Sequence, residues 1–459
     1  MNNTTSFLKD KFSKVLTNKS VVLSIGKLSD NYSKIFYELT SNLISINSNE
    51  TCEFIKSTSS ESVSFVKIND TNLKCLQDLS PLVLKNKPIL LIKSLNTVTK
   101  QESDECFDLL NNLNYKIYDA SPFDDIEDCV GPISKEEFEY YSNRVCVDGN
   151  FLCLHSSDVK SYNLPEIIKG KTSVIITGRN DSYKENERFI INLNKMLETF
   201  DEVIYIDWNS DKGSMLYEII DDIPKTKRLK HFIIEPEIAK ILTKFDPKTS
   251  SCCGYIAANI AIRRTDAEYI VVTAMDIIPP SKKIFENFIK TTNKHTFYSL
   301  SRRDISYTDV ISNKNNLDEY INHLNLTSSP RYFPAKVTPN DVYSMFNCPG
   351  DFQFATKNVW LKLKGYEENM LYACFGDTNI QKKSILNNFD LVPVYDVPLY
   401  HMNHGGMSND GLSPSKKYYN DAMEWVEYFD KYYSHGKYLI SKNENTWGSS
   451  DVEIEYEVI

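Results

Sequence analysis

Short apolar runs alternate with segments of helical periodicity in two separate series along this chain of 459 residues. This alternation is the strongest constraint on the fold, because strands that alternate with helices pair in a parallel sheet that the helices cover. In the first series the apolar runs predict buried strands at 20–26, 62–68, 88–94 and 115–121. Apolar residues at helical spacing predict helices at 31–45 and 100–113. We therefore predict an α/β domain over residues 1–121.

The second series begins at about residue 171 and predicts a larger α/β domain over residues 167–459. Its apolar runs predict strands at 172–178, 202–208, 267–278 and 295–304. Amphipathic spacing predicts helices at 185–200, 252–265 and 414–433. From about 300 to 348 the sequence is polar and rich in Asn, Ser, Asp and Pro, which predicts a long functional loop.

Residues 122–166 join the two series and have a different character. The segment begins as an acidic stretch, has a turn signal at Gly131-Pro132 and contains one predicted helix, 134–143. Domain boundaries usually fall in polar segments that contain turn residues. We therefore expect 122–166 to be a linker or a cover segment between the two domains.

The charge balance and the N-terminal sequence exclude several classes of protein. With 52 Lys and Arg against 62 Asp and Glu, the net charge is −10, whereas a protein that binds nucleic acid through its phosphates needs a basic face. The ten Cys are scattered without the spacing of a zinc site. The N-terminus has no apolar run after a basic start, and no segment reaches the ~18 apolar residues of a spanning helix. We therefore expect a cytoplasmic protein with no nucleic-acid partner and no membrane span.

Polar side chains follow the predicted strands of the second series, at the edge where open α/β sheets bind their ligands. These side chains include carboxylate, imidazole and guanidinium groups, which can bind metal ions and anions and can accept protons. The sequence therefore predicts a catalytic site at this edge. In chain order its candidates are Arg179, Asn180, Asp181, Asp207, Asp211, Asp276, Arg302, Arg303, Asp351, Asp377, His401 and His404.

With these residues in place, the segment from about 171 to 405 resembles the GT-A glycosyltransferases, most closely the inverting family-two type and the galactosyltransferase-like proteins of large DNA viruses. The string from Asn259 to Asp276 is similar to the family's strand that leads into D-x-D or N-x-D. The resemblance implies a GT-A fold for 167–459, a nucleotide-sugar donor and a glycan acceptor. The later family pattern G-D-F…W…G-Y-x-E…D matches Gly350-Asp351-Phe352, Trp360, Gly365-Tyr366-Glu367 and Asp377.

The resemblance also implies a role for individual side chains. Asp276, with His401 or His404, would hold a divalent cation, Mn²⁺ or Mg²⁺, that neutralises the leaving diphosphate. Asp377 stands where the family keeps the base that takes the acceptor proton, and Asp351 would orient the acceptor or the donor sugar. The donor, with UDP-sugars favoured, would contact Arg179, Asn180, Asp181, Asp207 (or alternatively Asp211), Asn259, Arg302 and Arg303.

Two positions depart from the family pattern. Ala274 stands at the first acidic position of D-x-D, and the Glu-Asp pair of the base site is replaced by Gly376-Asp377. A cation would therefore be held by fewer protein oxygens, and the base site has one carboxylate instead of two. These departures leave open a second interpretation, a catalytically inactive glycan-binding or scaffold protein.

The first series is similar, over about 60 residues, to the later part of FkbM-type S-adenosylmethionine methyltransferases. The acidic and glycine positions of that family's F-I-K-I-D-x-E-G pattern are replaced here by Asn69, Thr71 and Asn72, and a later Glu by Lys93. A cofactor site without its ribose-binding acid and tight glycine turn binds poorly. We therefore expect a degenerate Rossmann-like domain that binds no S-adenosylmethionine. The alternative is a glycan methyltransferase whose second half binds sugar.

Overall fold

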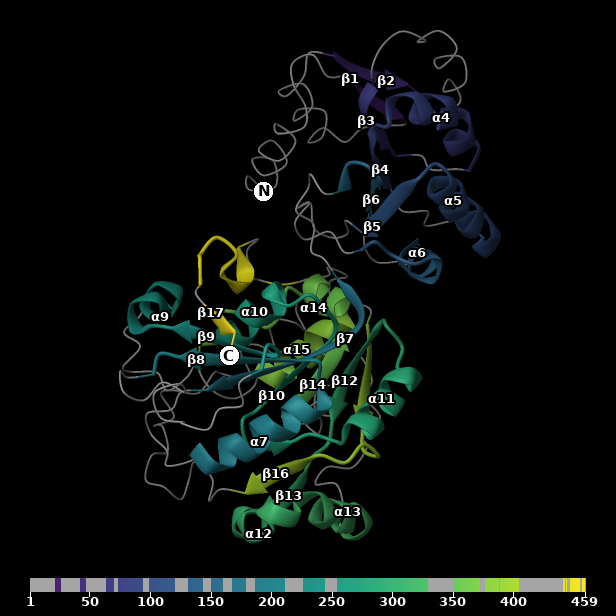
Figure 1. The fold of residues 1–459 in the computed structure, drawn as a ribbon. Helices are drawn as coiled ribbons and strands as arrows, with labels where there is room; N and C mark the ends of the chain where they lie inside the picture. Colours follow the sequence, from purple (N-terminus) through teal and green to yellow (C-terminus); the bar gives the residue numbers. More distant parts are fainter. Residues whose placement is uncertain are drawn as a thin grey trace. The chain divides into compact units, whose positions relative to one another are not determined.

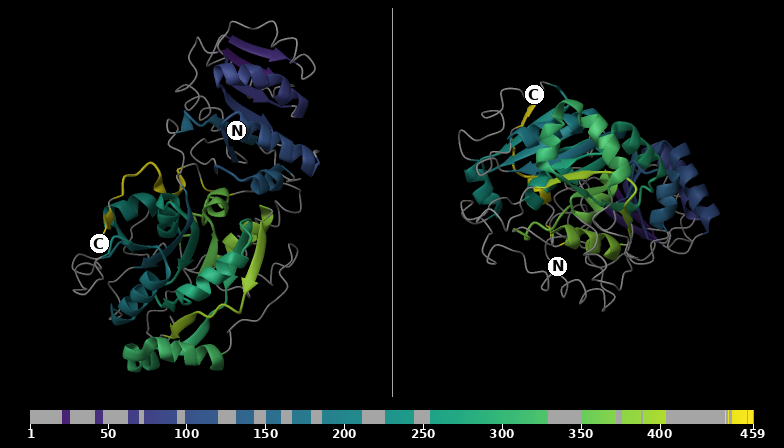
Figure 2. Two further views of the ribbon diagram at one scale, coloured as in Figure 1. Left: turned by 45° about the vertical axis from the view of Figure 1, so that its right-hand side comes forward. Right: turned by 90° about the horizontal axis from the view of Figure 1, so that it is seen from below.

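In the computed structural model the chain forms two units, Met1–Glu166 and Ile167–Ile459, and each is an α/β unit built on a mixed sheet (Figure 1; Figure 2). This α/β architecture confirms the predicted fold class. All structural statements below refer to the residues that the structure describes. These are 21–25, 42–46, 63–69, 73–93, 99–119, 131–142, 150–159, 167–178, 186–210, 226–243, 254–328, 350–371, 376–387, 389–403, 441, 443, 446–454 and 456–458.

The first unit is organised around a six-stranded sheet in the order β2-β1-β3-β4-β6-β5. The strands β2, β1, β3 and β4 are parallel, and β6 runs antiparallel to both of its neighbours. The central strands are nearly continuous buried apolar runs, which is typical of a parallel sheet that is covered on both faces. The strands are β1 (Val21–Ile25), β2 (Asn42–Ile46), β3 (Val63–Ile68), β4 (Ile89–Lys93), β5 (Tyr115–Asp119) and β6 (Asn150–His155).

Three described helices belong to this unit: α4 (Leu73–Asn86), α5 (Lys100–Asn112) and α6 (Lys135–Ser142). The start of α5 is fixed by a capping box, in which Thr99 and Glu102 each accept a hydrogen bond from the other's backbone N–H. The apolar faces of all three helices contribute to one buried cluster with the strands. Its members include Leu79, Leu110 and Phe138.

Two predictions for the first unit were wrong. Residues 42–46, at the end of the helix predicted over 31–45, form the parallel strand β2 at the sheet edge, because Ile44 and Ile46 alternate with Ser45 and pack against the buried cluster of this unit. The segment 122–166 is not only a linker. Its residues 150–155 form β6, which pairs with β4 and β5 and so completes the sheet of the first unit.

The second unit is organised around an eight-stranded sheet in the order β15-β12-β14-β10-β7-β8-β9-β17. The strands β10, β7, β8 and β9 are parallel to one another, whereas β14 runs antiparallel to β10 and β12. The strands are β7 (Ile168–Gly178), β8 (Glu202–Trp208), β9 (Leu229–Ile234), β10 (Ala267–Thr273), β12 (Thr296–Leu300), β14 (Phe352–Thr356), β15 (Asp390–Val394) and β17 (Tyr456–Val458).

Helices cover both faces of this sheet (Figure 1). On one face, α7 and α11 pack Phe189, Met196 and Phe285 against strand residues in one buried cluster. The other helices of the sheet include α10, whose residues from Ile256 to Ile262 are all buried. The described helices around this eight-stranded sheet are α7 (Asn186–Thr199), α9 (Pro236–Thr243), α10 (Gly254–Arg264), α11 (Lys282–Thr291), α14 (Lys357–Leu363) and α15 (Gly376–Leu386).

A separate three-stranded sheet, β11-β16-β13, lies beyond the carboxyl end of β10. Its strands are β11 (Ile277–Ile278), β13 (Arg303–Ser306) and β16 (Tyr400–Asn403). Three helical segments follow β13 and pack on this sheet (Figure 1): α12 (Tyr307–Ser312), η5 (Lys314–Asn316) and α13 (Leu317–Thr327). Val310 and Leu317 of these segments lie in one buried cluster with Tyr400 of β16.

The C-terminal residues 446–458 fold back on the second unit. Arg264 of α10 donates hydrogen bonds to the carbonyl oxygens of Gly448 (2.6 Å), Ser449 (2.7 Å) and Val452 (3.0 Å). The short helix η8 (Trp447–Ser449) packs on α10, and β17 then adds antiparallel to the outer edge of β9. We call residues 446–458 the C-terminal strap.

Two further predictions for the second unit need comment. The predicted loop over 300–348 was wrong in its first half, because β13, α12 and α13 occupy 303–327. A serine cap explains the start of α12, where Ser306 accepts a hydrogen bond from the backbone N–H of Asp309. The helix predicted over 414–433 lies outside the described residues. No described helix is both long enough and apolar enough to cross a membrane.

Candidate active site

The order of the parallel strands determines where a ligand can bind in the second unit. The chain moves from β7 outward to β8 and β9, then crosses to the other side of β7 to form β10. Such a reversal leaves a crevice at the carboxyl ends of the two strands that flank it, and open α/β sheets bind ligands there. Here the flanking strands are β7, which ends at Gly178, and β10, which ends at Thr273.

The three-stranded sheet collects polar side chains at this end of β10. Asp276 directly precedes β11, Asp304 lies in β13 and His401 lies in β16. Asp304 and His401 are paired residues of neighbouring parallel strands, so their side chains share one face of the sheet. The backbone N–H of Met402 donates to the carbonyl oxygen of Asp276 (3.0 Å) and fixes the third segment beside them.

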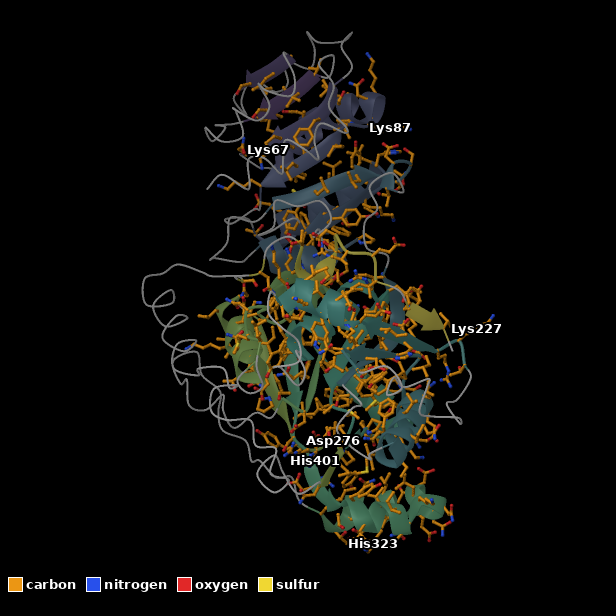
Figure 3. All side chains as sticks on the ribbon, turned by 90° about the vertical axis from the view of Figure 1, so that its left-hand side faces the viewer. Lys67, Lys87, Lys227, Asp276, His323 and His401 are labelled. Carbon is orange, nitrogen blue, oxygen red and sulfur yellow. The ribbon has the colours of Figure 1, made fainter. Side chains whose placement is uncertain are left out.

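His401 stands between the carboxylates of Asp276 and Asp304, and Figure 3 shows it beside Asp276. Its Nε2 lies 3.1 Å from Oδ2 of Asp276, and its Nδ1 lies 3.0 Å from Oδ1 of Asp304. The ring is largely buried, with 8% of the residue's surface exposed. A carboxylate on one ring nitrogen fixes the orientation of the imidazole.

Arg302 connects this group to a third carboxylate. Its Nε lies 3.1 Å from Oδ1 of Asp304, and its Nη1 lies 2.6 Å from Oδ1 of Asp351. A hydrogen bond fixes the backbone of Asp351: the hydroxyl of Thr273, at the end of β10, donates to the carbonyl oxygen of Asp351 (2.5 Å). Arg302 therefore joins the three-stranded sheet to the start of β14 next to the crevice.

Asp377 lies next to this group, in the first turn of α15. Gly350 packs directly on it: a Cβ atom at residue 350 would lie 2.2 Å from Cβ of Asp377. Glycine is therefore required at 350 for the two segments to approach this closely. Asp351 is the next residue along the chain, so the packing brings the carboxylates of Asp351 and Asp377 near each other.

Two carboxyl groups of this group, those of Asp351 and Asp377, have a pKa above the usual value. Burial raises the pKa of Asp351, and the charge of Asp276 adds to that effect, while the Arg302 guanidinium opposes it. Burial and the charge of Asp351 also raise the pKa of Asp377, against hydrogen bonds from the backbone N–H groups of Thr378 and Gly350. A base works best with a pKa near the working pH, and these shifts are in that direction.

Two of the side chains fit a divalent cation. Two ligands bonded at about 2.1 Å and at right angles to each other lie about 3 Å apart, which agrees with the 3.1 Å between His401 Nε2 and Asp276 Oδ2. Among the described residues no group of three or more His, Cys, Asp or Glu is arranged to hold a metal ion. The residues present therefore fit a cation that takes its remaining ligands from substrate phosphates, as Mg²⁺ commonly does.

The structure brings five of the predicted site residues together. Asp276, Arg302, Asp351, Asp377 and His401 form one connected group around the carboxyl end of β10. Four further candidates and the alternative Asp211 lie outside the described residues. They are Arg179, Asn180, Asp181 and His404.

Asp207 lies at the end of β8, but its side chain is fully buried. Its Oδ2 is 3.4 Å from Nε2 of the buried His231, and its Oδ1 accepts a hydrogen bond from Ser210. A carboxylate enclosed in this way does not face a ligand. The expected contact between Asp207 and the nucleotide therefore remains a prediction that requires His231 and Ser210 to move.

Asn259 is a structural residue in this arrangement. It is fully buried in α10, and its Nδ2 donates to the carbonyl oxygen of Tyr366 (2.8 Å) while its Oδ1 accepts from the N–H of Tyr366 (2.8 Å). Its amide is thus used to hold the turn after α14. We therefore remove Asn259 from the predicted donor contacts.

The turn held by Asn259 carries the G-Y-E string, and Glu367 in it is also buried. Its Oε1 lies 2.9 Å from Nζ of Lys383 on α15, with both side chains at 0% exposure. Lys383 also donates to the carbonyl oxygen of Gly365 (2.8 Å) and to Ser441 Oγ (2.9 Å). Trp360 is likewise fully buried, where it packs on other aromatic side chains. These motif residues therefore build the core beneath α15.

Arg303 points away from the group around β10. Successive residues of a strand face opposite sides, and Arg303 stacks over the ring of Tyr400 (5.9 Å) and approaches the carbonyl oxygen of Asn325 (3.5 Å). Of the predicted arginine clamp, Arg302 is the residue that joins the group around β10, through its ion pairs with Asp304 and Asp351.

Sequence reasoning missed Asp304, Tyr255 and Gln353. Asp304 lies two residues after Arg302 on a strand, and this alternation was the available signal that both share a face. Tyr255 accepts a hydrogen bond from the backbone N–H of Gly376, and Gln353 donates one to the carbonyl oxygen of Asp377. These contacts with α15 depend on tertiary packing, and the sequence carries no pattern for them.

No protein-family model and no curated protein matches this sequence. Among solved structures, one titled "Crystal Structure of a Mycobacterial Protein" is similar with a TM-score of 0.32 and 11% identity, over 56% of this chain and 74% of that chain. A crystal structure of GalNAc-T7 with UDP, GalNAc and Mn²⁺ is similar with a TM-score of 0.34 and 14% identity, over 59% of this chain and 51% of that chain. At this level the similarity carries no argument about activity, so the function must be argued from the site.

Proposed function

We propose that the second unit transfers a sugar from a nucleoside-diphosphate donor to a hydroxyl group of a glycan acceptor, in the manner of the inverting GT-A glycosyltransferases that its sequence resembles. One observation carries the proposal. Asp276, His401, Asp351 and Asp377 converge, with Arg302 among them, at the crevice beside the carboxyl end of β10. A group of this composition can neutralise a diphosphate and accept a proton.

Asp377 is the proposed base. As the acceptor hydroxyl attacks the anomeric carbon, its proton passes to a carboxylate oxygen of Asp377, and the bond to the diphosphate breaks. Burial raises the pKa of Asp377 above that of an exposed aspartate, which strengthens it as a proton acceptor. Asp351 lies beside it and would orient a sugar hydroxyl, with its own carboxylate held by Arg302.

Asp276 and His401 would hold a divalent cation, with Mn²⁺ or Mg²⁺ as candidates and Asp304 as the partner that orients His401. When bound, such a cation supplies Lewis-acid stabilisation of the charge that develops on the diphosphate. Arg302 adds a positive charge at the same edge.

The test is donor turnover by the full-length protein across UDP-, GDP- and dTDP-sugars, with and without Mn²⁺. We expect turnover by the wild type, and a loss of about 10²- to 10⁴-fold in kcat on Asp377→Asn, which cannot accept the proton. Asp276→Asn should raise the Mn²⁺ concentration needed for half-maximal rate. Asp318→Asn is the matched control, because Asp318 is an exposed carboxylate on α13 with 80% of its side chain accessible.

Two results would reject the proposal. The first is absence of turnover by the wild type with every donor, which would favour a glycan-binding scaffold. The second is full activity of Asp377→Asn. Thermal-shift measurements with S-adenosylmethionine and with UDP separate the remaining alternative, because stabilisation by S-adenosylmethionine alone would favour the methyltransferase.

A further inference from the structure

We propose that Tyr255 and Gln353 are positioning residues that hold the first turn of α15, and with it the carboxylate of Asp377, in its working orientation. The inference rests on the proposed function, in which Asp377 is the base. It assigns a role to two side chains that lie on different elements, α10 and β14, and that both contact the backbone at the start of α15.

The two contacts are made with the backbone N–H of Gly376 and with the backbone carbonyl group of Asp377. The N–H of Gly376 donates to Oη of Tyr255 (3.0 Å), and Nε2 of Gln353 donates to the carbonyl oxygen of Asp377 (3.2 Å). The first N–H groups of a helix have no acceptor within the helix. Tyr255 therefore supplies an acceptor that the start of α15 needs, and the bond from Gln353 to the carbonyl oxygen of Asp377, two peptide groups later, limits rotation of the turn.

A second row of contacts holds these two side chains in turn. Oε1 of Gln353 accepts a hydrogen bond from the hydroxyl of Tyr366 (2.5 Å), whose ring packs on that of Tyr255 with 5.3 Å between centroids. Burial raises the pKa of Tyr366 well above its usual value, so its phenol keeps the proton that it donates. Asn259, one turn after Tyr255 on α10, fixes the backbone of Tyr366 from both sides.

Steric contact removes the remaining freedom of the turn. A Cβ atom at residue 376 would lie 2.0 Å from Cζ of Tyr255, and one at residue 350 would lie 2.2 Å from Cβ of Asp377. The turn is thus held on two sides: Gly350 packs on the side chain of Asp377, and the ring of Tyr255 packs on Gly376. The same geometry gives a physical reason for Gly376, where the resemblance leads one to expect an acid: the ring of Tyr255 occupies the space that a side chain would need.

This positioning determines the environment of the Asp377 carboxylate. Backbone N–H groups of Thr378 and Gly350 lower its pKa, whereas burial and the charge of Asp351 raise it. Among the described residues, the phenols of Tyr366 and Tyr255 are further titratable groups close to this turn. If the first turn of α15 rotates, the carboxylate loses its N–H donors first, so its pKa rises further. A structural role elsewhere in the fold would leave that pKa unchanged.

The decisive experiment combines kinetics with a titration that needs no turnover. Tyr255→Phe removes one hydroxyl and keeps the ring, and Gln353→Leu with Tyr366→Phe removes a bonded pair together. We expect each variant to lower kcat by about tenfold or more with KM little changed, since a small misplacement of a catalytic group can cost ~10²-fold. In ¹³C NMR of protein labelled at the aspartate carboxyl carbon, with Asp377→Asn to assign the signal, the pKa of Asp377 should rise in both variants.

The matched control is Tyr298→Phe on β12. The hydroxyl of Tyr298 also accepts a hydrogen bond from a backbone N–H, that of Asn293 (2.6 Å). This substitution should change neither kcat nor the pKa of Asp377. An unchanged pKa of Asp377 in Tyr255→Phe would overturn the inference, whether or not kcat falls. If the wild type turns over no donor, the proposed function fails, and the NMR titration still decides whether Tyr255 positions Asp377.

Discussion

The buried ion pair between Glu367 and Lys383 allows a quantitative prediction. The two charged atoms lie 2.9 Å apart with both side chains at 0% exposure, which corresponds to about 6 kcal/mol of Coulomb attraction at an effective dielectric constant of about 20. In Glu367→Gln the amide replaces part of this attraction, and Lys383 keeps Gly365 and Ser441 as acceptors. We therefore expect the free energy of unfolding to fall by about 3 to 5 kcal/mol, the usual cost of breaking a buried pair.

The pH dependence of this loss identifies its cause. Burial lowers the pKa of Lys383 below its usual value, and the charge of Glu367 opposes that shift. In Glu367→Gln the opposition is gone, so the folded-state pKa of Lys383 falls further below the unfolded value. The folded state then binds fewer protons than the unfolded state, and stability rises with pH between the two pKa values. The loss on Glu367→Gln should therefore be smaller at pH 9.5 than at pH 7.

Urea denaturation of the full-length protein, followed by tryptophan fluorescence, measures both effects. The double variant Glu367→Gln with Lys383→Met should recover much of the stability, because it leaves no unpaired charge in the core. A loss below about 1 kcal/mol for Glu367→Gln, within the range of an exposed pair, would refute the reasoning. So would a loss that is the same at both pH values.

Three further predictions follow from other contacts. In Arg302→Leu the pKa of Asp351 should rise further above its unfolded value, so ionising this carboxyl costs stability as pH rises, and the drop in Tm should be larger at pH 7.5 than at pH 4.5. Arg264→Leu should destabilise the C-terminal strap by about 2 kcal/mol and speed its removal by protease, whereas unchanged proteolysis would show that Arg264 does not hold it. Gly376→Ala should lower both Tm and donor turnover because of the contact with Tyr255, and a Tm equal to that of the wild type would contradict this packing.

Local sequence patterns predicted the central strands because burial on both faces leaves a long apolar run. All seven residues of β8 (Glu202–Trp208) are buried, and most of them are apolar. The sequence pattern did not predict some strands whose pairing partner lies far away along the chain. The segment that forms β6 lies far along the chain from β4 (Ile89–Lys93), and its antiparallel position between β4 and β5 depends on that distant contact.

Some residues of the candidate site were also predictable from local sequence, whereas others depend on tertiary contacts. Asp276 was a candidate because it follows a long apolar strand, β10, at the edge where open α/β sheets bind ligands. His401 was expected just past a short strand, whereas it lies within β16. Asn259 was misassigned because a polar residue in a strongly matching string suggests a ligand contact, whereas its amide satisfies the backbone of a buried turn. The pairing of Asp304 with His401 depends on the register between β13 and β16. Register is a tertiary property that one strand's sequence does not specify.

The last strand of the C-terminal strap has a consequence for biosynthesis. In the described part of the chain, β9 is followed in the sheet only by β17, and β17 comes about 220 residues later in the sequence. During synthesis the outer edge of β9 therefore has unpaired N–H and C=O groups until Tyr456 to Val458 emerge. An open edge of this kind recruits strands from other chains. Newly made molecules are thus more exposed to aggregation until residues 456–458 have been synthesised and have paired with β9, and slower translation of the preceding segments would lengthen this interval.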